Sequence, residues 1–281
     1  MKLLVTGANG FTGQRFVTTA RARGHEVVAL LANLNDQDAL KEEVAYVAPE
    51  AVVHLAAISF VGHENDEEFY RVNVIGTINL LKALVQPGLK KARVLVASSA
   101  NIYGTPDIDV IDESVSPAPV NHYAASKLAM EYMVKAWFDK LPIVITRPFN
   151  YTGVGQHENF LIPKIVAHYR RGEKVIELGN LDVSRDFSDV RDVVDAYVSL
   201  LESDAYSTVV NICSGQAIAL REVIQKMNII AGYEIEVRVN PAFVRANEIP
   251  RLCGSNHYLK KLINFSPKYT FDQTLRSMFE T

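Results

Sequence analysis

The chain has 281 residues, 48% of them hydrophobic and 22% charged, which is ordinary for a globular protein of one large or two small domains. Its formal net charge of -3 excludes a general affinity for nucleic acids, and the lack of any run of about 18 apolar residues excludes a membrane-spanning helix. Cys213 and Cys253 are too few for a disulfide framework, so we expect a cytoplasmic protein with two reduced thiols.

Short apolar runs alternate with helical patterns in the first half of the chain. The predicted strands cover 2–7, 25–30, 50–57, 92–99 and 142–149, and the predicted helices cover 12–24, 37–49, 66–85 and 120–137. The apolar runs lack the polar alternation of half-exposed strands, as expected when both faces of a sheet are buried. The sequence therefore predicts a doubly wound parallel α/β sheet (a Rossmann fold), with its ligands beyond the carboxyl ends of the strands.

The pattern changes after residue 150. A polar segment with two glycines predicts a loop over 151–160. The further predicted elements are helices over 162–172, 190–203 and 219–232 and strands over 174–180, 207–215 and 234–241. We therefore expect a dinucleotide-binding domain over 1–155 and a smaller α/β substrate lobe over 156–281. Part of 181–213 is expected to return to the first sheet.

The stretch VTGANGFTGQRF places three glycines between the first strand and the first helix. Glycines at this point permit a tight turn and let the backbone approach a pyrophosphate at the helix N-terminus. A plain strand-to-helix turn is the alternative, but the position after a strand and before a helix favours dinucleotide binding. The expected contact residues of this loop are Gly7, Asn9, Gly10, Phe11, Thr12 and Gly13.

The second predicted strand ends without an acidic residue. NAD sites usually place a carboxylate there to bind the ribose hydroxyls, whereas NADP sites place a cation nearby. Leu31 stands where the acid is expected, and no Arg or Lys stands beside it, although Arg15 is a candidate. We therefore expect NADP(H) to be favoured over NAD(H).

Tyr123 and Lys127 lie four residues apart in a predicted amphipathic helix and therefore share one face. A free tyrosine has a pKa near ~10, which a nearby ammonium is expected to lower. Such a tyrosine can exchange a proton with a carbinol oxygen while hydride moves to or from the cofactor. An ordinary exposed pair is the alternative, which the glycine loop upstream disfavours. Ser98 and Ser99, at the end of a predicted strand, offer a hydroxyl to fix the substrate oxygen.

Taken together, these motifs resemble the extended short-chain dehydrogenase/reductase family. The matching segments, between residue 1 and about residue 255, are the glycine loop, VVHLAA, NVIGTINLL, SSANIYG, YAASK and RPFN. The resemblance implies that Ser99, five residues before Gly104, acts with Tyr123 and Lys127 in catalysis. It also implies that Asn33, in NLND, contacts adenine in place of the family's usual Asp. The other cofactor residues that it implies are Leu34, Leu55, Ala56, Ala57, Asn73, Tyr123, Lys127 and Arg147, with Asn73 acting through the backbone.

The second half is most similar to the GDP-4-keto-6-deoxy-mannose reductases and related GDP-sugar members of that family. The similarity lies in ITRPFNYTGVGQHENF, ELGNLDVSRDFSDVRDVVDAY and NICSGQAIALREVI. It implies that Arg185 and Arg245 clamp the substrate diphosphate, since planar guanidinium groups suit phosphate oxygens. Glu248 would accept bonds from the nucleotide ribose. The other candidate substrate contacts are Ser59, Phe60, Asn150 and Lys164.

Three classes of function remain open. The first is an NAD(P)H-dependent reductase of the C4 ketone of a nucleotide-linked 4-keto-6-deoxy-hexose. The second is a nucleotide-sugar 4-epimerase that holds NAD and returns the hydride to the same sugar. The third is a non-catalytic dinucleotide sensor, which the combination of Ser99, Tyr123 and Lys127 disfavours.

Dehydration of the sugar is disfavoured by chemistry. Family dehydratases carry an additional acid and base directly after the catalytic Ser or Thr, where this chain has Ala100 and Asn101. Neither side chain exchanges protons usefully near neutral pH. A partner 4,6-dehydratase is therefore expected to supply the substrate. The resemblance further implies a homodimer that pairs the helices around 66–86 and 121–139, and we expect no metal site.

Overall fold

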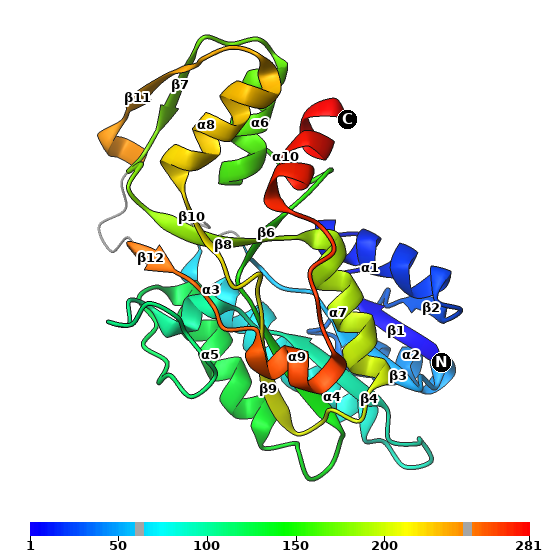
Figure 1. Cartoon of the computed structure of the whole chain (residues 1–281). Coiled ribbons are helices and arrows are strands. Elements are labelled where there is room, and N and C mark those ends of the chain that lie inside the picture. Colours follow the sequence, from blue (N-terminus) through cyan, green and yellow to red (C-terminus); the bar gives the residue numbers. More distant parts are fainter. Residues whose placement is uncertain (60–64, 244–248) are drawn as a thin grey trace.

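The computed structural model describes residues 1–59, 65–243 and 249–281, which form two lobes (Figure 1). In the first lobe six strands make one parallel sheet in the order β2-β1-β3-β4-β5-β9. These strands are β1 (Lys2–Thr6), β2 (Glu26–Ala29), β3 (Ala51–His54), β4 (Arg93–Ala97), β5 (Ile143–Pro148) and β9 (Thr208–Ile212). Every residue of β3 and β5 is buried, which explains their unbroken apolar runs.

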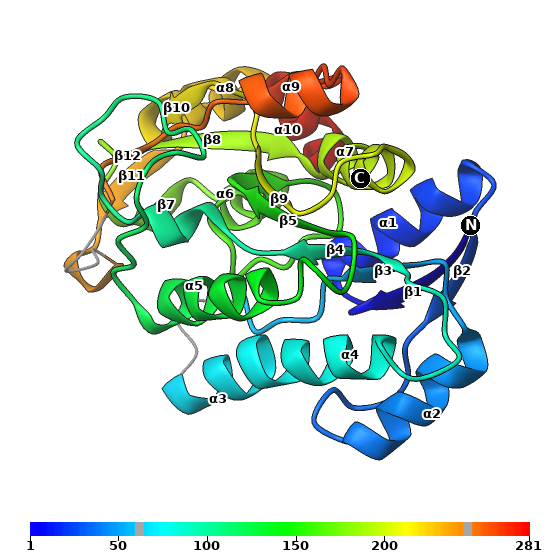
Figure 2. The same cartoon turned by 90° about the horizontal axis from the view of Figure 1, so that it is seen from below.

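Helices cover both faces of this sheet (Figure 2). On one face lie α1 (Phe11–Ala22), α7 (Val190–Glu202) and α9 (His257–Ile263). On the other face lie α2 (Gln37–Val47), α4 (Thr77–Leu84) and α5 (His122–Lys135). The predicted doubly wound parallel fold is therefore confirmed.

The helix predicted over 66–85 is present but is not uniform. It begins as α3 (Asp66–Tyr70), widens into the π-helical stretch η1 (Arg71–Gly76) and continues as α4. Such widened turns are frequent at functional sites. Here the stretch contains Asn73, a predicted site residue that is 1% exposed.

The second lobe is built on small sheets. Strand β8 (Ser184–Asp189) pairs with β10 (Ala217–Ala219), β12 (Arg251–Leu252) and β6 (Asn150–Thr152), and β7 (Val175–Leu178) pairs with β11 (Glu236–Val239). Helices α6 (Leu161–Arg170), α8 (Leu220–Ala231) and α10 (Phe271–Glu280) share its core. The prediction of a loop from residue 151 is wrong at its start, because β6 gains its partner from a strand distant in sequence.

The two lobes interleave along the chain. Strand β9 pairs with β5, and α7 and α9 pack on the first sheet, although all three follow residue 156. Part of the segment 181–213 thus lies in the first sheet, while α10, at the C-terminus, lies in the second lobe. A boundary at residue 155 therefore does not separate the lobes in space.

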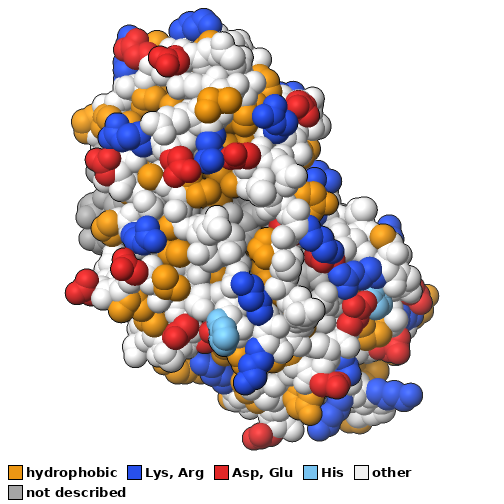
Figure 3. Space-filling view, viewed as in Figure 1, with side chains coloured by type: hydrophobic (Ala, Val, Ile, Leu, Met, Phe, Trp, Pro, Cys, Tyr) orange, Lys and Arg blue, Asp and Glu red, His pale blue; other side chains and the backbone are white. Residues whose placement is uncertain are grey.

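The distribution of surface charge and the two cysteines do not point to a particular ligand or partner. On the face drawn in Figure 3, acidic and basic side chains are interspersed instead of gathering by sign. Cys213 and Cys253 are free and buried. Among the residues that the structure describes, no helix is both long enough and apolar enough to cross a membrane.

Candidate active site

The carboxyl edge of the first sheet gathers most of the predicted site residues. The parallel register aligns Val5 with Val53, Val53 with Leu95 and Leu95 with Val144. The segments that follow these strands therefore lie side by side. They carry the glycine loop, Leu55–Ala57, Ser98–Ser99 and Asn150.

The glycine loop forms a close-packed cradle. Gly7 has a φ of 68°, and a Cβ added there would lie 2.8 Å from the backbone nitrogen of Ala56. A Cβ on Gly13 would lie 2.1 Å from the carbonyl oxygen of Gly7. Gly10 precedes α1, and no side chain among the described residues caps that helix. The first-turn N–H groups are thus available to an anion, so these residues fit a dinucleotide pyrophosphate.

Other residues of the loop are tied to the second lobe. The ring of Phe11 stacks on Tyr151 with centroids 6.3 Å apart, and the Thr12 hydroxyl lies 2.9 Å from the Tyr151 hydroxyl. Asn9 is exposed, and its carbonyl accepts a bond from the Gln14 side chain. Tyr151, which no sequence pattern singled out, therefore connects the glycine loop to β6.

A buried hydrogen-bonded chain fixes the end of β3. Thr6 Oγ1 accepts bonds from the N–H groups of Leu55 and Ala56 at 3.1 and 3.0 Å. It also lies 2.8 Å from His54 Nδ1, and His54 Nε2 lies 2.8 Å from Thr77 Oγ1. Burial lowers the pKa of His54 to about 3, so its ring is neutral. His54 is thus a positioning residue.

Asn73 extends this hydrogen-bonded chain to α5. Its amide accepts a bond from the N–H of Ile58 at 3.0 Å and donates to Ser126 Oγ at 3.1 Å. Ser126 Oγ in turn donates to the carbonyl of Tyr123 at 2.8 Å. Since the amide group of Asn73 also donates to the carbonyl of Ile58 at 3.2 Å, its bonds are made within the protein and order the backbone around the site.

Ser99, Tyr123 and Lys127, which we call the catalytic cluster, come together beyond β4. They are 7%, 8% and 3% exposed. Ser99 Oγ accepts a bond from the N–H of Asn101 at 3.2 Å, and its hydroxyl lies close enough to the Tyr123 hydroxyl to favour the phenolate. Asn121 caps α5 through a 2.8 Å bond from the N–H of Ala124, which starts the helix at the point that turns Tyr123 toward Ser99.

Burial dominates the electrostatics of this cluster. It raises the pKa of Tyr123 to about 12, opposed by the hydrogen bond from Ser99. It also lowers the pKa of Lys127 to about 8, opposed by the charge of Glu131, and the ammonium donates to the carbonyl of Ala97 at 2.9 Å. The prediction that Lys127 lowers the pKa of the phenol is therefore wrong for this structure. Tyr123 is protonated at neutral pH and can serve as a proton donor.

Arg147, predicted to contact the cofactor, lies elsewhere. It is 3% exposed and forms a buried ion pair with Glu131, with Nη2 to Oε2 at 2.7 Å. Its Nη1 donates to the Tyr103 hydroxyl at 2.8 Å. Arg147 thus supports α5 from β5 and does not reach the cleft.

A second group of residues lies at the end of β2, beside the glycine loop. We call Leu31, Ala32, Asn33 and Glu43 the β2 corner. Leu31 is 86% exposed. Its N–H donates to Glu43 Oε1 at 2.9 Å, and the N–H of Ala32 donates to Glu43 Oε2 at 2.6 Å. The sequence has no acidic residue at the end of β2, but in the folded chain Glu43 of α2 places a carboxylate there.

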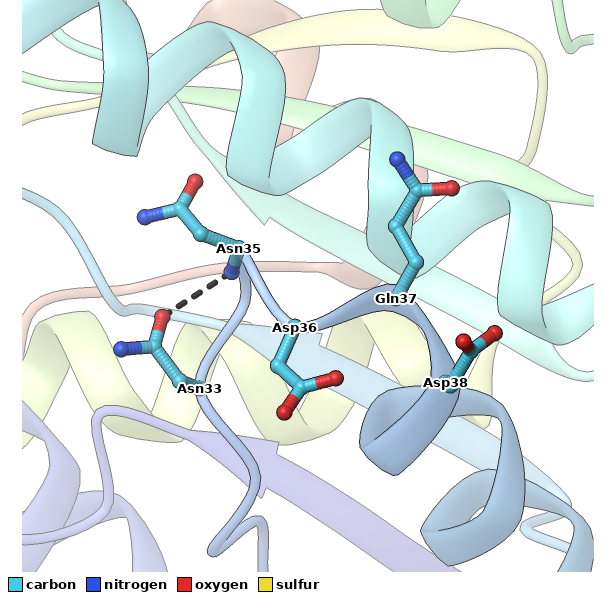
Figure 4. A pocket seen from close by; sticks show the side chains of 5 residues that line it. All are labelled: Asn33, Asn35, Asp36, Gln37 and Asp38. Atoms are coloured by element: carbon cyan, nitrogen blue, oxygen red, sulfur yellow. Dashed lines mark hydrogen bonds between the residues drawn. The ribbon is translucent and has the colours of Figure 1, made fainter.

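The turn between this corner and α2 borders an open hollow (Figure 4). Its lining side chains are Asn33, Asn35, Asp36, Gln37 and Asp38. Asn33 Oδ1 accepts a bond from the N–H of Asn35 at 2.9 Å. Leu34, predicted to contact the cofactor, instead buries its side chain in the core beneath α2 and α4.

The predicted substrate residues lie on both lobes. Ser59 and Asn150 are exposed at the carboxyl edge, after β3 and β5. Arg185 Nη1 donates to the carbonyl of Ser184 at 2.9 Å and lies 3.4 Å from that of Pro250. Lys164 donates to the carbonyl of Glu177 at 2.9 Å, and its ammonium lies 4.3 Å from the centre of the Phe243 ring. Phe60, Arg245 and Glu248 lie outside the described residues.

Comparison with known proteins finds one matching family model and similar proteins that are named for GDP sugars. The model of the GDP-mannose 4,6 dehydratase family matches residues 30–278. A GDP-6-deoxy-D-talose 4-dehydrogenase from Aggregatibacter actinomycetemcomitans is 37% identical over 275 residues, which cover 96% of this chain and 94% of that protein. A GDP-6-deoxy-D-mannose reductase from Pseudomonas aeruginosa is 35% identical over 292 residues, which cover 99% and 95%.

Solved structures match over the whole chain. RMD from Pseudomonas aeruginosa, complexed with NADPH, has a TM-score of 0.90 and 32% identity, with 100% of this chain and 98% of that one covered. The UDP-glucose 4-epimerase of Thermus thermophilus, complexed with NAD, has a TM-score of 0.89 and 27% identity, with the same coverage. Similar chains with this fold thus bind either nicotinamide dinucleotide.

Proposed function

Because the chain belongs to the extended short-chain dehydrogenase/reductase family, in the group that the GDP-mannose 4,6 dehydratase model describes, we propose a specific reaction. The protein is an NAD(P)-dependent oxidoreductase that acts on the alcohol or ketone of a sugar nucleotide. The reaction that we propose is reduction of the C4 ketone of a nucleotide-linked 4-keto-6-deoxy-hexose, with the GDP sugar as substrate. The neighbouring, buried hydroxyls of Ser99 and Tyr123 carry this proposal.

The catalytic cluster accounts for the proton side of the reaction. The dinucleotide supplies hydride when it is bound, and its pyrophosphate would lie on the glycine cradle. Ser99 and Tyr123 would both bond the ketone oxygen and polarise it. Tyr123, protonated at neutral pH, would donate its proton to the oxygen as the alcohol forms. The Lys127 ammonium, held by the carbonyl of Ala97, would bind the nicotinamide ribose.

The residues after Ser99 argue against dehydration. Ala100 and Asn101 begin a short 3-10 helix directly beside the cluster. Neither can remove or deliver the protons that elimination of water requires. The name of the matching family model therefore does not describe the proposed reaction, and a separate 4,6-dehydratase would make the substrate.

A nucleotide-sugar 4-epimerase is the second candidate. The similarity to a UDP-glucose 4-epimerase favours it, because the same cluster can oxidise and reduce one sugar in turn. The GDP-sugar names of the two relatives with 37% and 35% identity favour the reductase. Those names differ in the sugar, talose or mannose, so the configuration at C4 of the product is left to experiment.

The choice between NADP(H), which carries a 2′-phosphate, and NAD(H) is the finer part of the proposal. The NADPH complex of a relative supports the prediction that NADP(H) is favoured. The NAD complex of another relative supports the opposite. NADP(H) therefore stays a prediction, as does a cytoplasmic location.

A homodimer is proposed from the helices beside the site. Exposed apolar side chains lie on adjacent helices, with Ile75 49%, Tyr132 57% and Met133 44% exposed. These helices, η1 with α4 and α5, pack side by side (Figure 2). Burial of such side chains between two copies would stabilise a dimer. Light scattering on a Tyr132→Glu variant tests this, because the added charge should shift the protein to a monomer.

One reconstitution tests the proposed reaction. The protein is given GDP-mannose with NADPH or NADH, first alone and then with a GDP-mannose 4,6-dehydratase. Cofactor oxidation is expected only in the second mixture, with a GDP-6-deoxy-hexose as the product. Interconversion of two sugar nucleotides without net cofactor consumption would instead establish the epimerase.

A further inference from the structure

Glu43 lies at the place where a dinucleotide-binding sheet distinguishes NAD from NADP. In such folds the residues after the second strand bind the adenosine ribose, and an acid there favours the free 2′-hydroxyl. Strand β2 is hydrogen-bonded to β1, with Leu30 N–H to the Val5 carbonyl at 2.9 Å. The Leu31–Ala32 backbone therefore lies directly beside the glycine cradle. Both N–H groups of that backbone are occupied by the Glu43 carboxylate.

We infer that Glu43 is a specificity-determining residue that weakens NADPH binding relative to NADH. The inference rests on the proposed function, because it concerns the same dinucleotide. A carboxylate accepts a hydrogen bond from a ribose 2′-hydroxyl but repels a 2′-phosphate. It also occupies two N–H donors that a phosphate oxygen could otherwise use.

The charges around the corner do not offset Glu43. The hollow beside it is lined by two carboxylates, Asp36 and Asp38, and by three amides (Figure 4). Lys41 is paired with Asp38 at 3.2 Å. Arg15, a candidate phosphate ligand from the sequence, donates to the carbonyl of Val154 at 2.8 Å and so faces the second lobe. The described side chains of this hollow thus add negative charge, which disfavours a phosphate dianion.

The position of Glu43 also explains why the end of β2 can carry Leu31 in place of an acid. The carboxylate acts on the corner from α2, so the residue at the strand end need not carry the charge. Leu31 therefore gives no information on the cofactor by itself. The sequence prediction of NADP(H) rested on Leu31 and omitted this second source of negative charge.

Equilibrium binding of NADH and NADPH to the purified full-length protein tests the inference without a sugar substrate. Three variants are compared with the unmodified protein by fluorescence titration at low ionic strength. Glu43→Gln removes the charge and keeps the side-chain length, and Glu43→Ala also releases both N–H donors. Glu42→Gln is the control, because it removes the same charge from an exposed neighbour on the same helix. Adenosine 2′,5′-bisphosphate and 5′-AMP serve as probes of the adenosine end of the cofactor site alone.

Both Glu43 variants should raise the affinity ratio of NADPH to NADH by about tenfold or more, and the gain should shrink at high salt. The ratio for adenosine 2′,5′-bisphosphate to 5′-AMP should move in the same direction. Glu42→Gln should change either ratio less than about twofold. An unchanged ratio in both Glu43 variants, or an equal gain in Glu42→Gln, overturns the inference while leaving the proposed function intact. Failure of the unmodified protein to bind either dinucleotide overturns both.

Discussion

The catalytic cluster and the β2 corner lie along the same edge of one sheet but differ in burial. Ser99, Tyr123 and Lys127 are all less than a tenth exposed, whereas Leu31 is 86% exposed. In the cluster, burial shifts the pKa of both Tyr123 and Lys127. At the corner, the Glu43 carboxylate accepts bonds from two backbone N–H groups. Proton transfer thus depends on desolvated, fixed groups, while discrimination between cofactors can be set at the surface.

The largest effect should follow removal of the proton donor in the buried cluster. Tyr123→Phe keeps the ring that packs against Phe69 but removes the hydroxyl. Turnover should fall roughly 10²–10⁴-fold, with little change in substrate affinity. Steady-state kinetics and substrate titration separate these two quantities. Near-normal turnover would show that another group supplies the proton.

A smaller but still large effect is expected in the glycine cradle next to the cluster. In Gly13→Ala the new Cβ would lie 2.1 Å from the Gly7 carbonyl oxygen, so the backbone must shift. We expect a loss of about 3 kcal/mol in unfolding free energy, as for other overpacked sites, and loss of NADH binding.

Gly10→Ala is the matched control for the cradle. Its Cβ would meet the same oxygen at 3.3 Å, and the φ of Gly10 is -74°, which any residue adopts. It should cost about 1 kcal/mol or less. Equal losses in urea unfolding of the two variants would contradict the cradle geometry.

The pH dependence should report the buried lysine. Since burial lowers the pKa of Lys127 to about 8, the ammonium is charged below that pH and neutral above it. Tyr123, with its pKa raised to about 12, stays protonated throughout. Single-turnover reduction should therefore be constant below pH 8 and fall as pH rises through 8.

Lys127→Arg separates this lysine from other titrating groups. A guanidinium stays charged over the whole range, so the variant should lose the decline near pH 8, even if its rate is lower at every pH. A decline that persists in this variant would assign the titration to a different group.

The smallest effect is expected at the exposed end. Leu31→Ala removes a side chain that is 86% exposed and leaves both backbone bonds to Glu43 in place. Unfolding free energy and NADH affinity should each change by less than about 0.5 kcal/mol. A larger loss of affinity would mean that the Leu31 side chain itself contacts the adenosine. The β2 corner would then depend on a specific side-chain contact, as the catalytic cluster does, despite its greater exposure.

The sequence by itself determined the features that depend on neighbouring residues. Unbroken apolar runs between helices required a parallel sheet covered on both faces, and strand order then brought the glycine loop and Ser99 to one edge. The spacing of Tyr123 and Lys127 placed both on one helix face. Gly7 and Gly13 were required where backbone segments approach each other closely, which the structure shows as contacts that a Cβ would block.

Only the tertiary structure decided which partner each polar group has and how strongly it is desolvated. Arg147 could face the cleft or Glu131, and the carboxyl end of β2 could lack a charge or receive Glu43 from α2. The fall expected in the pKa of Tyr123 depended on Lys127 alone, whereas burial by many distant residues raises it. Hydrophobic periodicity and backbone conformation are local properties, but ion pairing and desolvation depend on residues that only the folded chain brings together.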